Sequence, residues 1–254
     1  PNKLKYKFLR RFLYPLFRFA FNHKNQKIIF QNEYDPGLLS SLKLISSTKS
    51  IIIEGSGVDL NTFRFLPEPN GVPVISFAAR LLIDKGVEVF VEASEILKKR
   101  KINVHFWLIG QPDPGNINSV SIKQLKEWES KGLIEWLGYR DDISYLFSKS
   151  NIVTLPSFYG EGLPKVLIEA AASGRPIITT DHPGCRDSVD SGKTGLLISP
   201  KDPVQLADTI CILLNDSSLR IKMGIAGRKK AEKMFDVSKV VTKHMLIYKD
   251  LLNN

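Results

Sequence analysis

The chain has 254 residues, of which 43% are hydrophobic and 24% are charged, a composition that excludes a disordered or fibrous protein and allows a substantial core. Two cysteines in so long a chain exclude a disulfide framework and predict a reducing, cytoplasmic compartment, and four scattered histidines offer no metal-ligand spacing. The formal net charge is +10. No zinc-finger, RNP or helix-turn-helix signature accompanies it, so the charge does not predict nucleic-acid binding.

The positive charge is concentrated in residues 1–27, which hold no acid. Their eight basic residues are Lys3, Lys5, Lys7, Arg10, Arg11, Arg18, Lys24 and Lys27. Within residues 3–21, apolar side chains from Phe8 to Phe21 recur at helical spacing, which predicts a basic amphipathic helix kinked at Pro15 and too charged to span a bilayer. This helix either lies on an anionic membrane surface or packs in the core of a domain whose other parts are missing, and the two interpretations are compatible.

From residue 27 onward, short β-branched runs alternate with helical patterns. Strands are predicted at 27–31, 50–55, 73–78, 103–110, 133–138, 151–156, 176–181 and 195–199. Helices are predicted at 35–46, 86–100, 121–131, 142–149, 165–173, 203–215, 218–234 and 237–252. This alternation predicts an α/β fold with a Rossmann-like, doubly wound parallel sheet, in which ligands bind beyond the carboxyl ends of the strands.

The predicted elements divide the chain into four parts. Residues 60–72 hold two prolines and a glycine without periodicity, which predicts a linker. The elements within residues 1–59 are too few for a domain of their own and are predicted to be the remnant of an N-terminal domain. The main domain is predicted at 73–236, followed by a helical segment at 237–254.

Charged and aromatic residues follow several of the predicted strands. Arg80 and Lys85 lie on the turn before a helix, where two cations beside exposed backbone amides can bind a diphosphate. Taken by themselves, two solvated surface charges are the more common arrangement. Gly110 ends the next strand and can let a ligand approach the backbone. Tyr139 and Arg140 follow the strand after it and can flank a nucleobase.

The stretch SFYGEGLPKVLIEA, residues 157–170, places Glu161 in a loop and Glu169 about one turn into the following helix. Two carboxylates this close can act as a general acid and base, hold the two ends of a ligand, or be ordinary surface charges. Glu161 can reach the far end of a ligand, whereas Glu169, fixed on a helix, can accept hydrogen bonds from a vicinal diol. Backbone amides from Leu163 to Val166 form a second anion site at the helix start.

Together these motifs resemble the donor-binding half of family 4 (group 1) glycosyltransferases of the GT-B fold, which are retaining nucleotide-sugar enzymes. The resemblance covers residues 50–250 and is carried by GSGVDLNTF, ARLLIDKG, WLIG, GYRDD, PSFYGEGLPKVLIEAAASGRPIITTD, PGCRD and GKTGLLISPKD. The two glutamates, eight positions apart in a Gly/Pro loop and the helix after it, are its most specific part. The pattern is most similar to bacterial members that build lipid-linked oligosaccharides, O-antigen or capsule.

The resemblance implies a role for each candidate residue. Arg80 and Lys85 bind the diphosphate and stabilise the leaving nucleotide, Glu161 faces the donor sugar, and Glu169 holds the ribose hydroxyls. The other donor-binding positions are Gly110, Tyr139, Arg140, Gly162, Leu163, Pro164, Lys165 and Val166. The glutamate pair then holds the two ends of a nucleotide sugar and is not an acid–base dyad.

The resemblance also has departures. Ala79 stands where the family has a glycine before the arginine, and Pro164 replaces a glycine often found in the glutamate loop. Residues 1–59 correspond only to the tail of an amino-terminal acceptor domain. The helix at 237–252 is the one that crosses back to that domain.

Further expectations concern cofactors and partners. No DxD motif stands at a strand end, and Asp141 and Asp142 are expected to cap a helix, so neither a metal nor another cofactor is expected. A UDP-sugar is favoured over a GDP-sugar on resemblance alone. The acceptor is expected to be a lipid-linked saccharide, reached through peripheral contact of residues 3–21 with the inner face of the cytoplasmic membrane.

Three other functions compete with a transferase. A truncated, non-catalytic nucleotide-sugar-binding module fits the same residues, and nothing in the sequence separates it from an enzyme. A GT-B hexose-nucleotide epimerase is disfavoured because GEGLPKVLIEA resembles the transferases far more closely. A dinucleotide-dependent oxidoreductase is disfavoured because no G-x-G-x-x-G follows any predicted strand.

Overall fold

A computed structural model describes residues 3–21, 23–46 and 49–253, and its centre is a six-stranded parallel sheet. The strands are β3 (Val74–Ala78), β4 (His105–Ile109), β5 (Glu135–Gly138), β6 (Ile152–Leu155), β7 (Ile177–Thr180) and β8 (Gly195–Ile198). Their order across the sheet is β5-β4-β3-β6-β7-β8, with all neighbours parallel. The doubly wound parallel sheet predicted from the sequence is therefore confirmed.

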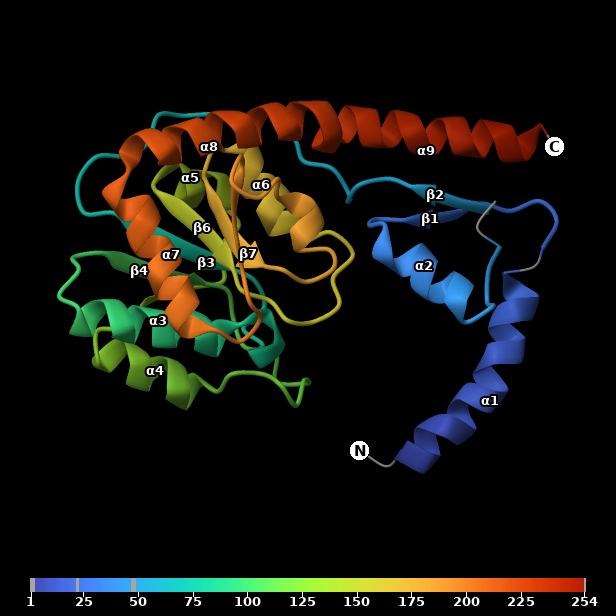
Figure 1. Ribbon diagram of the computed structural model, residues 1–254, viewed down its shortest axis with the longest axis horizontal. Coiled ribbons are helices and arrows are strands. Elements are labelled where there is room, and N and C mark those ends of the chain that lie inside the picture. The colour runs from blue at the N-terminus through green and yellow to red at the C-terminus, as the bar shows by residue number, and fades with distance from the viewer. Residues whose placement is uncertain (1–2, 22, 47–48, 254) are drawn as a thin grey trace.

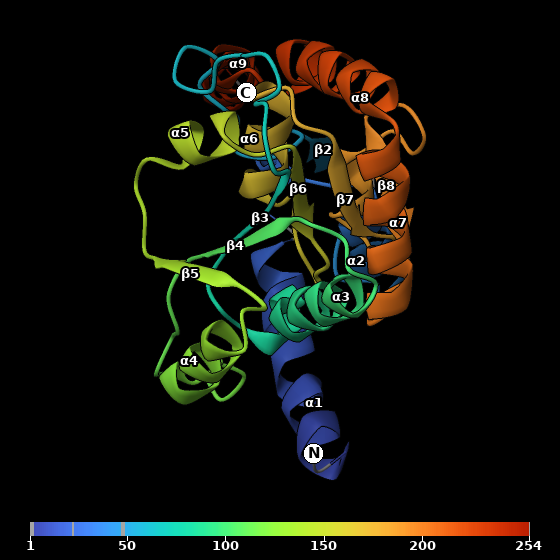
Figure 2. The same ribbon diagram turned by 90° about the vertical axis from the view of Figure 1, so that its left-hand side faces the viewer.

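Helices cover both faces of this sheet, which is why its central strands are continuous apolar runs. The helices are α3 (Val87–Lys99), α4 (Ile122–Ser130), α5 (Ile143–Ser148), α6 (Lys165–Ala172), α7 (Pro203–Asn215) and α8 (Ser217–Lys230). Figure 2 shows α5 and α6 on one side of the sheet and α3 and α4 on the other. Every residue of β3, β6 and β7 is buried.

Local chemistry sets where several helices begin. Ser121 and Gln124 form a capping box at the start of α4. The Asp202 carboxylate accepts a hydrogen bond from the Gln205 amide at 2.8 Å, and Pro203 occupies the first helical position of α7. The Asp236 side chain caps α9 (Val237–Leu252) in the same way. Each of these helices therefore starts where a short polar side chain satisfies a first-turn amide.

The strand order reverses between β3 and β6, because the chain leaves β5 and returns on the other side of β3. In open α/β sheets, ligands bind beyond the strand ends at such a reversal. The turn after β3 approaches the end of β6 closely. Gly86 there has φ +84°, and a Cβ on it would lie 2.2 Å from the Pro156 carbonyl oxygen. Only glycine permits both features, so Gly86 allows the two strand ends to meet.

The N-terminal segment, defined as residues 3–57 where described, lies beside the sheet domain and outside its layers (Figure 1). It contains α1 (Lys3–Ala20), β1 (Ile28–Phe30), α2 (Tyr34–Ser41) and β2 (Ser50–Ile52), and β1 pairs with β2 in parallel. The predicted helix at 35–46 ends early, because Lys43 adopts a left-handed φ of +56° just after α2. Pro15 lies inside α1. The side chains of Lys3, Lys5 and Lys7 lie outside the described part.

Helix α9 joins the two parts of the molecule. A π-helical turn, Ala231–Phe235, follows α8, and α9 then runs along the β1–β2 pair, as Figure 1 shows. Ile53, Val240 and Ile247 form a small buried cluster between them. The Lys243 ammonium lies 3.0 Å from the Glu54 carboxylate beside this cluster. The N-terminal segment is thus anchored by the last helix of the chain.

Residues 60–72 contain no helix or strand, yet side chains of the sheet domain bind them. The Glu68 carboxylate lies 2.6 Å from Arg220 Nε and accepts a hydrogen bond from Asn151 Nδ2 at 2.6 Å. Arg175 is 2% exposed and donates to the Leu66 carbonyl at 2.8 Å, and its burial lowers the pKa of its guanidinium. This stretch is therefore fixed to the sheet domain. Among the described residues, no helix is both long and apolar enough to cross a bilayer.

Candidate active site

A cavity of about 310 Å³ lies at the strand reversal, beyond the carboxyl ends of β3 and β4. Its lining includes six residues singled out from the sequence: Arg80, Gly110, Tyr139, Arg140, Val166 and Glu169. They come from separate segments, and the sheet brings them together because parallel strands end at the same edge. Sequence reasoning missed Ile109, Gln111 and Ile143, which line the same cavity and show no local motif.

Glu169 contributes a shielded carboxylate from α6. Its side chain is 12% exposed, and its carboxylate forms an ion pair with Lys165 Nζ at 3.5 Å. Burial raises the pKa of Glu169 above its ordinary value of 4.5, an effect that Lys165 partly opposes. Hydrogen-bond donors of a ligand would stabilise the ionised form of such a shielded carboxylate. The helix position predicted for Glu169 is therefore suited to binding hydroxyl groups.

Arg80 follows β3 and reaches the cavity from the sheet side. Its guanidinium Nη1 lies 3.1 Å from the Asp113 carboxylate, which belongs to the loop after β4. The Arg80 side chain remains 65% exposed, so a ligand can reach it. Asp113 is itself held, because its backbone amide donates to Ser119 Oγ at 2.8 Å. No local motif indicates Asp113, since an acid in a proline-rich loop is ordinary.

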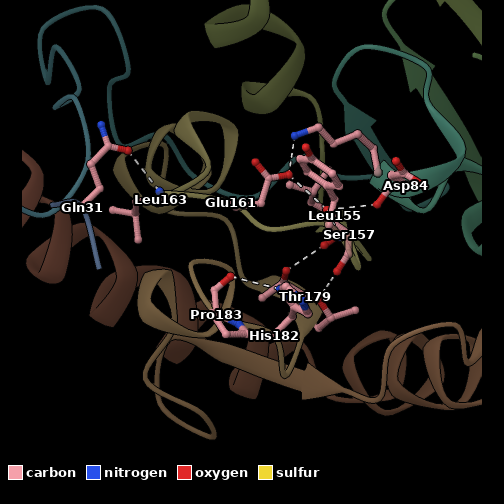
Figure 3. Close-up of polar contacts among 12 residues, drawn as sticks. Gln31, Asp84, Leu155, Ser157, Glu161, Leu163, Thr179, His182 and Pro183 are labelled. Atoms are coloured by element: carbon pink, nitrogen blue, oxygen red, sulfur yellow. Dashed lines mark hydrogen bonds and ion pairs between the residues drawn. The ribbon is translucent and has the colours of Figure 1, made fainter. Parts of the chain in front are cut away.

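Glu161 belongs to a second cluster, which does not line the 310 Å³ cavity. Its carboxylate forms an ion pair with Lys85, and the two side chains are 13% and 17% exposed. Ser157 Oγ donates to the same carboxylate at 3.1 Å, and Figure 3 shows Ser157 and Glu161 side by side. Lys85 ends the 3₁₀ turn Ile83–Lys85. A lysine and a glutamate predicted to serve one ligand thus contact each other directly.

The loop between the two glutamates is bound by the N-terminal segment. The Leu163 amide donates to Gln31 Oε1 at 3.2 Å, as Figure 3 shows, and the Gly162 carbonyl accepts from Asn32 Nδ2 at 2.9 Å. In this conformation the Leu163 amide is therefore occupied. Pro164 stands at the N-cap of α6 and has no side-chain acceptor, so the first-turn amides of Lys165 and Val166 lack a side-chain cap. Lys165 extends into solvent.

The expected helix capping by Asp142 is wrong, and two other candidate residues show further detail. Asp142 stands at the N-cap of α5 without capping it; its carboxylate instead accepts from Arg140 Nε at 2.7 Å, and this pairing lowers its pKa. Gly110 has φ +134°, and a Cβ there would lie 1.9 Å from the Ala79 carbonyl. That position needs glycine because the backbone of the neighbouring strand's end approaches it closely. This requirement holds whether or not a ligand also approaches Gly110. Tyr139 is 71% exposed at the rim.

Two other observations bear on ligands. A larger cavity of about 780 Å³ lies between the N-terminal segment and α8, with Lys230 and Asp190 paired at 2.8 Å in its lining. It shares none of the strand-end residues above, so its size does not make it the better candidate. Within the described ranges, no group of three or more His, Cys, Asp or Glu side chains is arranged to hold a metal ion.

The sequence matches the family model described as glycosyl transferases group 1 over residues 59–230, more than half of the chain. This chain belongs to that family. The match spans the sheet domain and both clusters, so the resemblance inferred from the motifs is confirmed. The arrangement of the sheet is that of GT-B glycosyltransferases.

Similar proteins support the same assignment. An N,N'-diacetylbacillosaminyl-diphospho-undecaprenol alpha-1,3-N-acetylgalactosaminyltransferase of Campylobacter jejuni is 28% identical over 252 residues, covering 94% of this chain. The capsular polysaccharide biosynthesis glycosyltransferase CapM of Staphylococcus aureus is 32% identical over 163 residues, covering 64% of this chain. The chain spans 64% and 42% of the lengths of these relatives.

Solved structures show the fold independently. Anabaena Alr3699/HepE in complex with UDP superposes with a TM-score of 0.79 and 20% identity, over 92% of this chain and 67% of that one. The sucrose-phosphate synthase of Thermosynechococcus elongatus superposes with a TM-score of 0.77 and 24% identity, over 89% and 58%. Both likenesses concern the fold.

Proposed function

We propose that this chain is the donor-binding portion of a retaining, metal-independent glycosyltransferase. It transfers a sugar from a UDP-sugar to a lipid-linked or saccharide acceptor during surface polysaccharide synthesis. The observation that carries the proposal is the cavity at the strand reversal, where Arg80 and Glu169 meet. The family assignment and the names of the relatives support it.

The cavity accounts for binding of the nucleotide. The nucleoside occupies the space of about 310 Å³, with the shielded Glu169 carboxylate accepting hydrogen bonds from both ribose hydroxyls. The diphosphate lies between Arg80 and the uncapped amides of Lys165 and Val166 at the start of α6. Tyr139 at the rim stacks on the base. Each group then binds one part of the donor, which agrees with the roles implied by the resemblance.

The same groups favour departure of the nucleotide. Breaking the bond between sugar and diphosphate transfers an electron pair to the phosphate oxygen, so negative charge grows beside Arg80 and Lys85. Fixed cations and helix amides stabilise that charge without reorganising, and each such contact contributes about 2–4 kcal/mol in comparable sites. Lys85 is already oriented by Glu161. Glu161 then serves the donor sugar through hydrogen bonds, with Lys85 holding its carboxylate in place.

Support for the donor base and the acceptor comes from similar proteins. UDP is bound in the Anabaena structure, and the name of the Campylobacter relative includes a diphospho-undecaprenol acceptor. A lipid-linked acceptor fits an exposed amphipathic α1, on which Phe12 and Leu16 are 61% and 65% exposed. We therefore assign residues 3–21 to peripheral membrane contact. A non-catalytic nucleotide-sugar-binding module is the second candidate, because the same donor-site residues would serve it.

Calorimetric titration of UDP and GDP in EDTA tests the proposal. Wild type is expected to bind UDP more tightly than GDP, with binding weakened at least tenfold in Glu169→Ala and Arg80→Ala. Glu92→Ala, exposed on α3, is the matched control and is expected to bind UDP like wild type. Absence of nucleotide binding by the wild-type chain would overturn the proposal.

Turnover separates the two candidate functions. Transfer of sugar to a lipid-diphosphate acceptor, unchanged in EDTA, is the result expected for the transferase, and NMR of the first-formed product reports retention at the anomeric carbon. Donor binding without transfer to any acceptor would favour the binding module. Loss of transfer in EDTA, with recovery on adding Mn²⁺, would contradict the metal-independent mechanism.

A further inference from the structure

The loop that carries Glu161 is held in place by a residue of the N-terminal segment. Asn32, in the turn after β1, is 2% exposed. Its Nδ2 donates to the Gly162 carbonyl at 2.9 Å and lies 3.2 Å from the Glu161 carbonyl. The residue is 130 positions away from Gly162 in the sequence. The peptide that carries the Glu161 side chain is therefore fixed from outside the sheet domain.

Asn32 is itself rigidly held. Its Oδ1 accepts a hydrogen bond from the Asp35 amide at 2.8 Å, and its Nδ2 also donates to Asp35 Oδ2 at 2.9 Å. A buried amide with both ends satisfied keeps one orientation, because any rotation would leave buried polar groups unpaired. The Asn32 side chain therefore fixes the position of the backbone carbonyls that it binds.

Further parts of the molecule pack on the same loop. A Cβ on Gly184 would lie 2.3 Å from the Glu161 carbonyl oxygen, so the loop after β7 packs directly on that peptide. Leu163 is 6% exposed and packs on Gly55 of the N-terminal segment, where a Cβ would lie 2.8 Å from its Cδ2. The segment between Glu161 and Leu163 is therefore enclosed between the two parts of the molecule.

The Glu161 side chain leaves this enclosed peptide toward Lys85 and Ser157. We propose that Asn32 is a positioning residue for the donor sugar: by fixing the Glu161 peptide, it makes sugar recognition depend on docking of the N-terminal segment onto the sheet domain. The proposal rests on the proposed function. Nucleotide binding through Arg80 and Glu169 does not involve Asn32. The nucleotide and the sugar of the donor are therefore bound by residues that are held in place by different parts of the molecule.

Two kinds of role for Asn32 predict different measurements. A residue that only stabilises the fold would weaken binding of UDP and of UDP-sugars by the same factor when it is replaced. A positioning residue leaves the affinity for UDP unchanged and removes only the additional affinity that the sugar provides. The ratio of the dissociation constants for UDP and for the UDP-sugar therefore distinguishes the two roles.

The experiment measures this ratio for the full chain with a panel of UDP-hexoses and UDP-N-acetylhexosamines. Wild type is expected to bind its preferred UDP-sugar about tenfold more tightly than UDP, as expected for hydrogen bonds to a charged group. Asn32→Ala is expected to bind UDP within twofold of wild type and to lose most of the tenfold difference. Asn32→Leu, which keeps the buried volume, is expected to behave in the same way if the alanine variant folds poorly.

Asn25→Ala is the matched control, because Asn25 lies in the same segment and donates to the Leu251 carbonyl of α9 at 2.8 Å without touching the loop. It is expected to keep the wild-type ratio. The inference is overturned if Asn32→Ala keeps that ratio, if it weakens UDP and UDP-sugar equally, or if wild type gains nothing from the sugar. Failure of wild type to bind UDP at all is a separate result, which removes the proposed function.

Discussion

The sheet domain and the N-terminal segment differ in how each is stabilised. One continuous buried cluster runs through the sheet domain from Val58 to Phe235. In the described part of the N-terminal segment, by contrast, Leu44 and Ile53 are the buried hydrophobic residues, and α1 exposes Phe12 and Leu16. The sheet domain can therefore maintain its own fold, whereas the segment depends on its neighbours for a position.

The contacts between the two parts follow from this difference. Besides the small cluster on α9, the segment meets the sheet domain through polar side chains, Gln31 and Asn32, at the loop that carries Glu161. Polar contacts of this kind specify an orientation while burying little apolar surface.

The largest expected effect compares the two cores. Phe77 is 0% exposed and its ring lies 5.4 Å from that of Phe90, so Phe77→Ala is expected to lower the free energy of unfolding by about 3–5 kcal/mol. Ile53 lies in the separate α9 cluster, so Ile53→Ala is expected to change unfolding of the sheet domain by less than about 1 kcal/mol. Chemical denaturation measures both.

Limited proteolysis completes this test. In Ile53→Ala the region around β1 and β2 is expected to be cut faster, because its anchor on α9 is weakened while the sheet remains folded. Equal losses of stability in the two variants would show instead that the segment and the sheet unfold as one cooperative unit.

The next effect concerns the exposed face of α1. If this face contacts membranes, Phe12→Asp and Leu16→Asp should each weaken binding to phosphatidylglycerol vesicles by tenfold or more, because burying one such side chain is worth about 1.5–3 kcal/mol. Ile117→Asp, 98% exposed on a loop of the sheet domain, should bind like wild type. Vesicle co-sedimentation is the measurement, and an equal loss in the control would argue against α1.

A smaller effect is expected from pH at the donor site. Burial raises the pKa of Glu169, and ribose hydroxyls prefer its ionised form, so nucleoside binding should release a proton. Affinity for uridine should then rise with pH up to the raised pKa and level off above it, by at most about tenfold per pH unit. Calorimetry checks this, with Glu169→Gln expected to show a flat profile; a flat wild-type profile would contradict it.

The smallest effect concerns the partner of Arg80. Asp113 occupies the guanidinium that the diphosphate needs, so Asp113→Asn should raise affinity for UDP. Because the pair is exposed, the gain should be no more than about fivefold at low salt. In an Arg80→Ala background the same substitution should have no effect. A gain that persists without Arg80 would show that Asp113 acts through general charge and not through this pair.

Much of the sheet domain was predictable from local patterns. The eight predicted strands are present, each shorter than predicted, and the helices at 203–215 and 237–252 have the predicted bounds. Those two begin at Asp202 and Asp236, whose capping is set by residues two or three positions away. Local chemistry of this kind can be predicted from one sequence. The same is true of the candidate site residues that follow the parallel strands.

Other features depended on residues far apart in the chain. Asp142 pairs with Arg140 and does not cap α5, and the predicted linker at 60–72 is fixed through Glu68 and Arg220. Nothing local indicates these outcomes, because each follows from which side chains reach the same space. The helix predicted at 35–46 was wrong at its end for a local reason, the left-handed Lys43.

The sequence by itself determined the elements, the parallel sheet, and the positions of Arg80 just after a strand and of Glu169 on a helix, since periodicity and strand connectivity dictate them. Only the tertiary structure decided that Asp113 holds Arg80 and that Lys85 holds Glu161. It also decided that Asn32 binds the backbone carbonyls of Glu161 and Gly162. Those contacts join segments separated by tens of residues or more. Their geometry is set by how the sheet edge and the N-terminal segment pack together, which no local pattern encodes.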